Sequence, residues 1–143
     1  MSPSPPLTQF IGRTERTLGA LMDQVLTETG GTFDQWVALN FTAAAGNSIA
    51  RDELISRLTD AQIGDGAAEA AIAELTRDGL IDAAPGSLVT LTDAGRERYA
   101  RIRAAIDRTT APLFADLAAD DVAATQRVLT TISERAGARL ARA

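Results

Sequence analysis

Arginine and carboxylate side chains supply most of the reactive groups of this 143-residue chain. It carries 14 cationic residues, all of them arginine, against 19 acidic ones, and it contains neither histidine nor cysteine. Guanidinium groups bind phosphates and carboxylates, whereas carboxylates accept hydrogen bonds. The missing imidazole and thiol groups exclude a Ser-His-Asp triad, a zinc–thiolate site and a thiol redox centre. Because no nucleophile, base and orienting group stand at a recognisable spacing, we expect a protein that is not an enzyme and uses no metal or other cofactor.

The few aromatic side chains are the other candidates for binding chemistry. Phe33, Trp36 and Phe41 lie close together in the sequence, whereas Phe10 and Tyr99 lie further away. Two interpretations stay open: these side chains either wall a pocket for an aromatic ligand or pack in the core. In the first, the Tyr99 hydroxyl would hydrogen-bond a ligand carboxylate, and in the second Tyr99 would anchor a long helix.

A long helix is expected near the start of the chain, after a proline-rich arm. Residues 1–6 read MSPSPP, a composition that favours an extended or disordered arm. From Leu7 onward apolar residues recur in steps of three and four, which predicts an amphipathic helix of about twenty residues. Gly30 and Gly31 are expected to end it.

A second helix is predicted around the aromatic cluster. Thr32 and Gln35 have capping-box spacing, so the helix should begin directly after Thr32. Gly46-Asn47 is a pair that breaks helices and should end it. We expect this helix to lie at the centre of the core, because it holds half of the aromatic residues.

Two shorter helices are predicted next. The first covers residues 51–58 and is followed by a turn. The second covers residues 66–77, with Asp65 as its cap, and Asp78-Gly79 ends it. Its predicted buried positions are Ala68, Ala71, Ile72 and Leu75.

The period of the apolar residues then changes from that of a helix to that of strands. Residues 80–83 and 87–91 read as two short strands, and residues 84–86 (APG) read as the tight turn between them. The segment is therefore predicted to form a small hairpin.

Helices are predicted again in the last third of the chain. Thr92 or Asp93 should cap a long helix, which Pro112 interrupts or kinks. Asp120 and Asp121 should cap a final helix, an interpretation we prefer to a metal site because adjacent acids at a helix start complement its dipole.

This order of elements predicts a mainly α-helical protein with a winged helix-turn-helix. Three helices followed by a two-stranded hairpin, here residues 32–92, are typical of that fold. The helices of residues 7–31 and 93–143 are too long to bury their apolar stripes on so small a unit, so we expect them to form a dimer interface. No apolar run approaches the roughly 18 residues that cross a bilayer, and residues 1–7 lack an apolar signal core, so we expect a cytoplasmic protein with no membrane partner.

Four short motifs, in this order and spacing, resemble the MarR family of bacterial transcriptional regulators. They are QWVAL (35–39) in the second helix, DELISRL (52–58) in the third, LTRDGLI (75–81) before the hairpin and LTDAGR (91–96) after it. The resemblance implies a homodimeric, ligand-responsive repressor that binds a pseudo-palindromic operator in double-stranded DNA. It also implies a small aromatic or phenolic effector held between the dimer helices and the winged unit.

The resemblance also assigns the residues that would contact DNA. Arginines of the third and fourth helices would bind phosphates, and the start of the fourth helix would face the groove. The phosphate contacts are Arg51, Arg57 and Arg77, and the groove-facing residues are Gln62, Asp65, Gly66, Ala67, Glu69 and Ala70.

The local charge departs from the family pattern and keeps a second hypothesis open. Residues 60–92 hold a single arginine against six acids, and the wing tip, residues 83–87, carries no cation. DNA affinity depends strongly on cations that neutralise phosphates. The alternative is therefore a degenerate winged-helix dimer that has lost DNA binding and acts as a small-molecule or protein interaction module.

Overall fold

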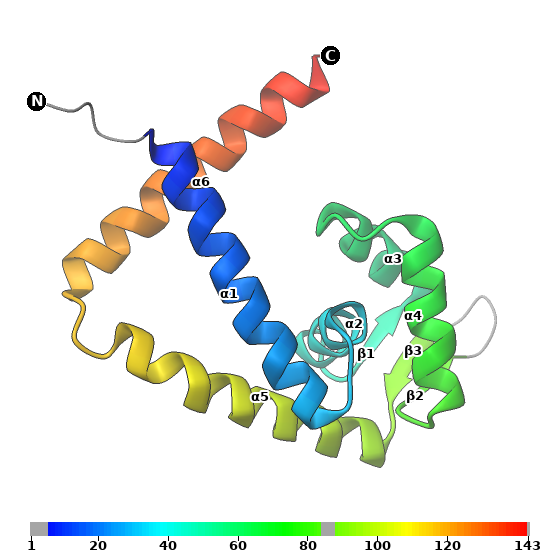
Figure 1. The fold of residues 1–143 in the computed structure, drawn as a ribbon. Coiled ribbons are helices and arrows are strands. Elements are labelled where there is room, and N and C mark those ends of the chain that lie inside the picture. Colours follow the sequence, from blue (N-terminus) through cyan, green and yellow to red (C-terminus); the bar gives the residue numbers. More distant parts are fainter. Residues whose placement is uncertain (1–5, 84–87, 143) are drawn as a thin grey trace, which may run out of the picture. The chain divides into compact units, whose positions relative to one another are not determined.

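The computed structural model describes residues 6–83 and 88–142 (Figure 1). The chain forms two compact units, Met1–Asp107 and Arg108–Ala143. Residues 1–5 of the predicted arm, the predicted turn at residues 84–86 and residue 87 of the second predicted strand lie outside the described residues. Within the described part of the chain, no helix is long and apolar enough to cross a bilayer.

Helix α1, Leu7–Thr29, ends where the two glycines predict. Gly30 adopts a left-handed φ of 86°, and the N–H groups of Gly30 and Gly31 donate to the Leu26 carbonyl at 2.9 and 3.0 Å. Glycine suits this position because a Cβ disfavours positive φ. The C-terminal end of α1 is buried through Val25 and Leu26, whereas apolar side chains nearer its start are exposed, including Leu7, Phe10 and Leu18.

Helix α2, Phe33–Ala44, begins at the predicted cap. The Thr32 hydroxyl oxygen accepts a hydrogen bond from the Gln35 backbone N–H at 3.3 Å, which satisfies one of the free amides of the first turn. The helix buries Trp36, Ala38, Leu39 and Thr42, but Phe33 is 47 % exposed, so of the two interpretations left open for the aromatic residues, core packing does not hold for Phe33. Phe33 is the first residue of the helix, where its ring lies outside the packed stripe.

Helices α3, Arg51–Asp60, and α4, Asp65–Arg77, form the second and third helices of the trihelical unit. The four buried positions predicted for α4 are confirmed. Asp65 is not the cap, however: Gly64 occupies that position, and the Asp65 carboxylate accepts instead from the Thr59 hydroxyl at 3.0 Å. An acid within the first turn still complements the helix dipole, which explains why the sequence suggested a cap.

The sheet has one strand more than the hairpin that the sequence predicted. Strands β2, Ile81–Ala83, and β3, Leu88–Leu91, pair antiparallel as expected. β1, Ser48–Ala50, pairs with the other edge of β3, which gives the order β1-β3-β2. Ser48 lies opposite Thr90, and their hydroxyl oxygens are 3.1 Å apart. Three residues are too few to show an alternating pattern, and their partner strand lies about forty residues further along the chain, so the sequence gave no signal for β1.

The last two helices correct two further expectations. Thr92 caps α5, Asp93–Phe114, because its hydroxyl oxygen accepts from the Gly95 N–H at 3.0 Å. Pro112 does not interrupt α5; it lies in the last turn, where its missing N–H removes a single helical hydrogen bond. The cap of α6, Ala119–Ala141, is Ala118, and Asp120 and Asp121 lie in its first turn rather than before it.

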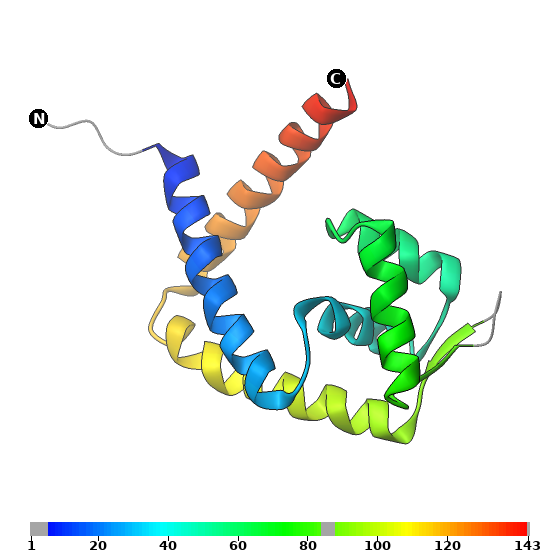
Figure 2. The ribbon, with the colours of Figure 1, turned by 45° about the vertical axis from the view of Figure 1, so that its right-hand side comes forward.

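The core of the first unit lies between the three short helices and the sheet. Leu54, Leu58, Ala68 and Val89 have no exposed surface, and they join α3, α4 and β3. Ile63, in the turn between α3 and α4, is also buried. This core fixes α3, α4 and the base of the wing against one another (Figure 2).

Candidate nucleic-acid interface

The exposed face of α4 is a smooth surface with an acidic edge. Because α4 buries one stripe in the core, the residues on its other side face solvent. Half of them are glycine or alanine, too small to protrude, so a partner of complementary shape can approach the backbone of α4 closely. The exposed residues are Asp65, Gly66, Ala67, Glu69, Ala70, Ala73, Thr76 and Arg77.

The turn before α4 is held by its backbone. Gln62 has a positive φ of 70°, and its N–H donates to the Thr59 carbonyl at 3.0 Å. The next residue, Ile63, donates to the Leu58 carbonyl at 2.9 Å and buries its side chain. The anchored Ile63 leaves Gln62 exposed beside the start of α4, which is compatible with the groove-facing role predicted for it.

An ion pair joins the start of α3 to the exposed face of α4. The guanidinium of Arg51 donates to Glu69 Oε2, and the side chains of Arg51 and Glu69 are 26 % and 52 % exposed. Both residues are predicted DNA contacts, and the structure brings them together although they stand eighteen positions apart.

The other two predicted phosphate contacts differ in their surroundings. Arg57 donates to Glu53 Oε1 at 2.8 Å across one turn of α3, and both side chains are about half exposed. Their four-residue spacing is the sequence signal for this pair, because residues four apart share a helix face. Arg77 is exposed at the C-terminal end of α4.

Glu74 links the middle of the trihelical unit. The Gln35 side-chain amide donates to Glu74 Oε2 at 2.8 Å, which ties α2 to α4. Both residues are partly buried, so this hydrogen bond is shielded from solvent more than the ion pairs of α3.

The five aromatic side chains predicted for a ligand pocket lie in different surroundings. Trp36 and Tyr99 stack, with ring centroids 5.4 Å apart and an angle of 13° between the planes. The Tyr99 hydroxyl donates to Asn40 Oδ1 at 3.4 Å. Phe10, in contrast, lies 15 residues before the buried end of α1 at Val25, which corresponds to roughly 22 Å along the helix.

Phe41 lines a hollow that Trp36 and Tyr99 do not line. The hollow has a volume of about 380 Å³. Its other lining residues are Arg57 and Asp60 of α3 and Ala61, which directly follows α3. It is therefore separate from the stack of Trp36 on Tyr99.

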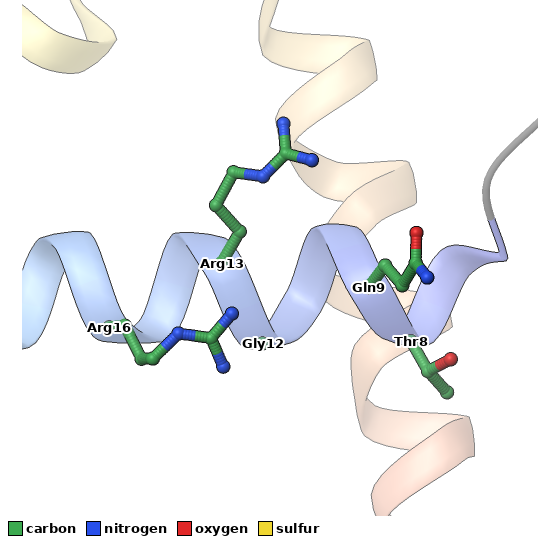
Figure 3. A pocket seen from close by; sticks show the side chains of 5 residues that line it. All are labelled: Thr8, Gln9, Gly12, Arg13 and Arg16. Carbon is green, nitrogen blue, oxygen red and sulfur yellow. The ribbon is translucent and has the colours of Figure 1, made fainter.

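A second hollow, of about 430 Å³, lies along the first half of α1 (Figure 3). Thr8, Gln9, Gly12, Arg13 and Arg16 line it. The Arg13 guanidinium lies 5.7 Å from the centre of the Phe10 ring, a cation–π contact. Two guanidinium groups with a hydroxyl and an amide beside them suit an anionic group. The one signal for this site in the sequence is the three-residue spacing of Arg13 and Arg16 on a predicted helix, which places both on one face.

The fold and this geometry define a class: a winged helix-turn-helix with long flanking helices. No protein-family model and no curated protein sequence matches the chain. Solved structures do match. A mutant MarR from E. coli in complex with operator DNA has a TM-score of 0.73 and 22 % identity, over 89 % of this chain and 93 % of that chain.

Two further structures were solved with small molecules. NadR in complex with 4-hydroxyphenylacetate has a TM-score of 0.74 and 16 % identity, over 93 % of this chain and 98 % of that chain. A MarR family protein from Mycobacterium tuberculosis in complex with salicylic acid has a TM-score of 0.64 and 22 % identity, over 90 % of this chain and 99 % of that chain. The chain therefore has the MarR-type winged-helix fold, and the fold class predicted from the sequence is confirmed.

Proposed function

We propose that this protein is a ligand-responsive, DNA-binding transcriptional regulator that acts as a homodimeric repressor and not as an enzyme. The observation that carries the proposal is the pairing of α3 and α4 across a short anchored turn, with α4 in contact with strand β2 of the wing and one face of α4 exposed. In helix-turn-helix proteins the second helix of such a pair enters the major groove. The likeness to an operator-bound MarR structure supports the same assignment.

In this proposal the contacts divide into two groups. Arg51, Arg57 and Arg77 bind phosphates and set the orientation on the duplex. The turn and the first half of α4 face the base edges, through Gln62, Asp65, Gly66, Ala67, Glu69 and Ala70.

Selection of DNA from a random duplex library tests the proposal. We expect the full chain to enrich a pseudo-palindromic sequence, and its affinity, measured by fluorescence anisotropy, to fall steeply between about 50 and about 200 mM salt. The affinity depends on salt because arginines that bind DNA phosphates release the counterions condensed on the duplex. No enrichment over random DNA at the lower salt concentration would contradict the proposal.

The second unit supplies the support for a homodimer. None of the residues of α6 is buried, and large apolar side chains of this unit are exposed: Leu113, Phe114, Leu117, Val128, Leu129 and Leu140. An apolar helical face of this extent is stable in water only when something covers it. A second copy of the chain is the proposed cover, because a twofold axis places identical apolar faces against each other.

Charges placed on this face should separate the protomers. Val128→Glu combined with Leu129→Glu is expected to convert a species of twice the chain mass into a monomer, because two carboxylates would have to be buried at the interface. Light scattering coupled to size exclusion measures the mass. Thr130→Glu combined with Thr131→Glu adds the same charge on the same exposed helix and should leave the dimer intact. A monomeric wild type, or a Val128/Leu129 variant that stays dimeric, would show that this face is not the interface.

A small aromatic or phenolic effector is the proposed signal. Tyr99 stacks on the buried Trp36 and is itself only partly buried, so its ring could contact a ligand, and the two similar structures with bound 4-hydroxyphenylacetate and salicylic acid support this ligand class. Trp36 is the single tryptophan of the chain, so its fluorescence reports on this region. We expect salicylate or 4-hydroxyphenylacetate to quench it with saturation and to release the selected DNA over the same concentration range. A linear response equal to that of free tryptophan in the same solutions would count against a site near this stack.

The alternative is an interaction module with the same fold and no DNA binding. The observation that favours it is the charge of residues 60–92, together with the pairing of Arg51 and Arg57 to acids. Under this alternative the library selection fails, while the dimer and the quenching of Trp36 fluorescence by the effector remain. The two functions are thus separated by the DNA selection alone.

A further inference from the structure

Glu69 is an acidic residue at a position where a negative charge would ordinarily weaken binding to DNA. It lies one turn into α4 on the exposed face, and DNA phosphates repel a lone carboxylate. The pair with Arg51 changes this balance, because the two side chains together carry no net charge. A carboxylate held by Arg51 can therefore approach a duplex at a smaller electrostatic cost than an isolated one.

The pair also leaves part of the carboxylate free. An ionised glutamate has two oxygens with about four acceptor sites, and Arg51 occupies a site on Oε2. About half of the Glu69 side-chain surface is exposed. The free acceptor sites point to a partner that donates hydrogen bonds and offers no competing negative atom.

Among the base edges of the major groove, cytosine fits this requirement best. Cytosine presents its N4 amine as a donor. Adenine also presents a donor, N6, but its acceptor N7 lies beside it and would repel a carboxylate. Guanine presents two acceptors, and thymine an acceptor with a methyl group, so neither offers a donor to Glu69.

The neighbours of Glu69 do not compete for this role. Gly66, Ala67, Ala70 and Ala73, which share the exposed face, have no polar side-chain atom, and their small size lets the helix backbone approach a groove closely. The nearest polar side chain on the same face, Asp65, accepts a hydrogen bond from the neutral Thr59 hydroxyl, and among the described residues no cation pairs with its carboxylate, so its negative charge stays uncompensated. Glu69 is thus the acidic side chain of the first half of α4 that combines free acceptor sites with a compensating cation.

We infer that Glu69, held in place by Arg51, is a specificity-determining residue that selects a cytosine at one position of each operator half-site. The inference rests on the proposed DNA-binding function and adds to it the base that is read. Arg51 acts as a positioning residue for the carboxylate as well as a phosphate contact.

Base preference, rather than affinity, tests this inference. The full chain and its Glu69→Gln and Glu53→Gln variants are each used to select DNA from the same random duplex library. Every base pair of the selected operator is then replaced in turn, and binding is measured by anisotropy. Glu53→Gln is a matched control. Each variant removes one negative charge and breaks one ion pair of an α3 arginine: Glu69→Gln releases Arg51, and Glu53→Gln releases Arg57.

The wild type should prefer cytosine by about tenfold at one position per half-site, the size of a typical single mismatch. Glu69→Gln should reduce this preference to less than about twofold at that position and leave the others unchanged. Glu53→Gln should keep the preference, although both variants gain affinity from the lost negative charge. A Glu69→Gln variant with the wild-type base profile and only a uniform gain in affinity would overturn the inference, while the proposed function stands. Failure of the wild type to enrich any sequence overturns both.

Discussion

Gly95→Ala is expected to lower the free energy of unfolding by about 3 kcal/mol. A Cβ built on Gly95 would lie 1.9 Å from the Leu80 carbonyl oxygen and 3.4 Å from a Leu91 methyl carbon. The carbonyl belongs to the backbone and already accepts from the Thr92 N–H at 3.1 Å, so it has little freedom to move away. Either the first turn of α5 or the base of the wing must shift.

Denaturant unfolding followed by circular dichroism measures this loss. Since native domains are stable by about 5–15 kcal/mol, the variant should remain folded at low temperature but melt clearly earlier. Gly66→Ala is the control, because an added Cβ meets nothing within 4 Å there and alanine favours the helix. A Gly95→Ala variant as stable as Gly66→Ala would mean that the junction of wing and α5 is looser than the structure shows.

Arg51→Ala combined with Arg77→Ala should lower operator affinity by about a thousandfold near 0.1 M salt. In the proposed dimer the double variant removes four phosphate contacts, and each contributes about 0.9 to the slope of log affinity against log salt concentration. The slope should therefore decrease in magnitude by roughly 3.6. Loss of the exposed Arg51–Glu69 pair costs little stability, so the variant should fold.

Anisotropy on the selected operator at several salt concentrations gives both quantities. Arg127→Ala combined with Arg135→Ala removes the same charge from exposed positions of α6, and it should leave the slope within about one contact of the wild-type value. If the Arg51/Arg77 variant keeps the wild-type affinity and slope, these arginines do not contact phosphates.

Local signals were read correctly from the sequence. The end of α1 at Gly30 and the Thr32 cap of α2 depend on residues within five positions of each other, so their chemistry is visible without a structure. The four buried positions of α4 followed from helical periodicity for the same reason.

Features that depend on distant partners were not predictable in this way. Strand β1 exists because β3 pairs with it, and Ser48-Ile49-Ala50 alone shows no strand pattern. The Arg51–Glu69 pair requires the angle between α3 and α4, which the core sets. Both residues were predicted from the sequence as DNA contacts, but only the structure shows that they pair. The cytosine preference that we infer depends on the charge compensation within this pair. The boundaries predicted for the dimerisation helices and the winged unit stay predictions.

Strand β1 has a consequence for how the winged unit moves. Its pairing with β3 closes the chain between Ser48 and Leu91 into a loop that contains α3, α4 and β2. Opening any of these elements alone would also disturb the sheet or the shared core, so their amides should exchange with solvent as one cooperative unit with similar opening free energies. In the proposed dimer, effector binding would then move each winged unit as a rigid body, changing the separation of the two α4 helices rather than the shape of either winged unit.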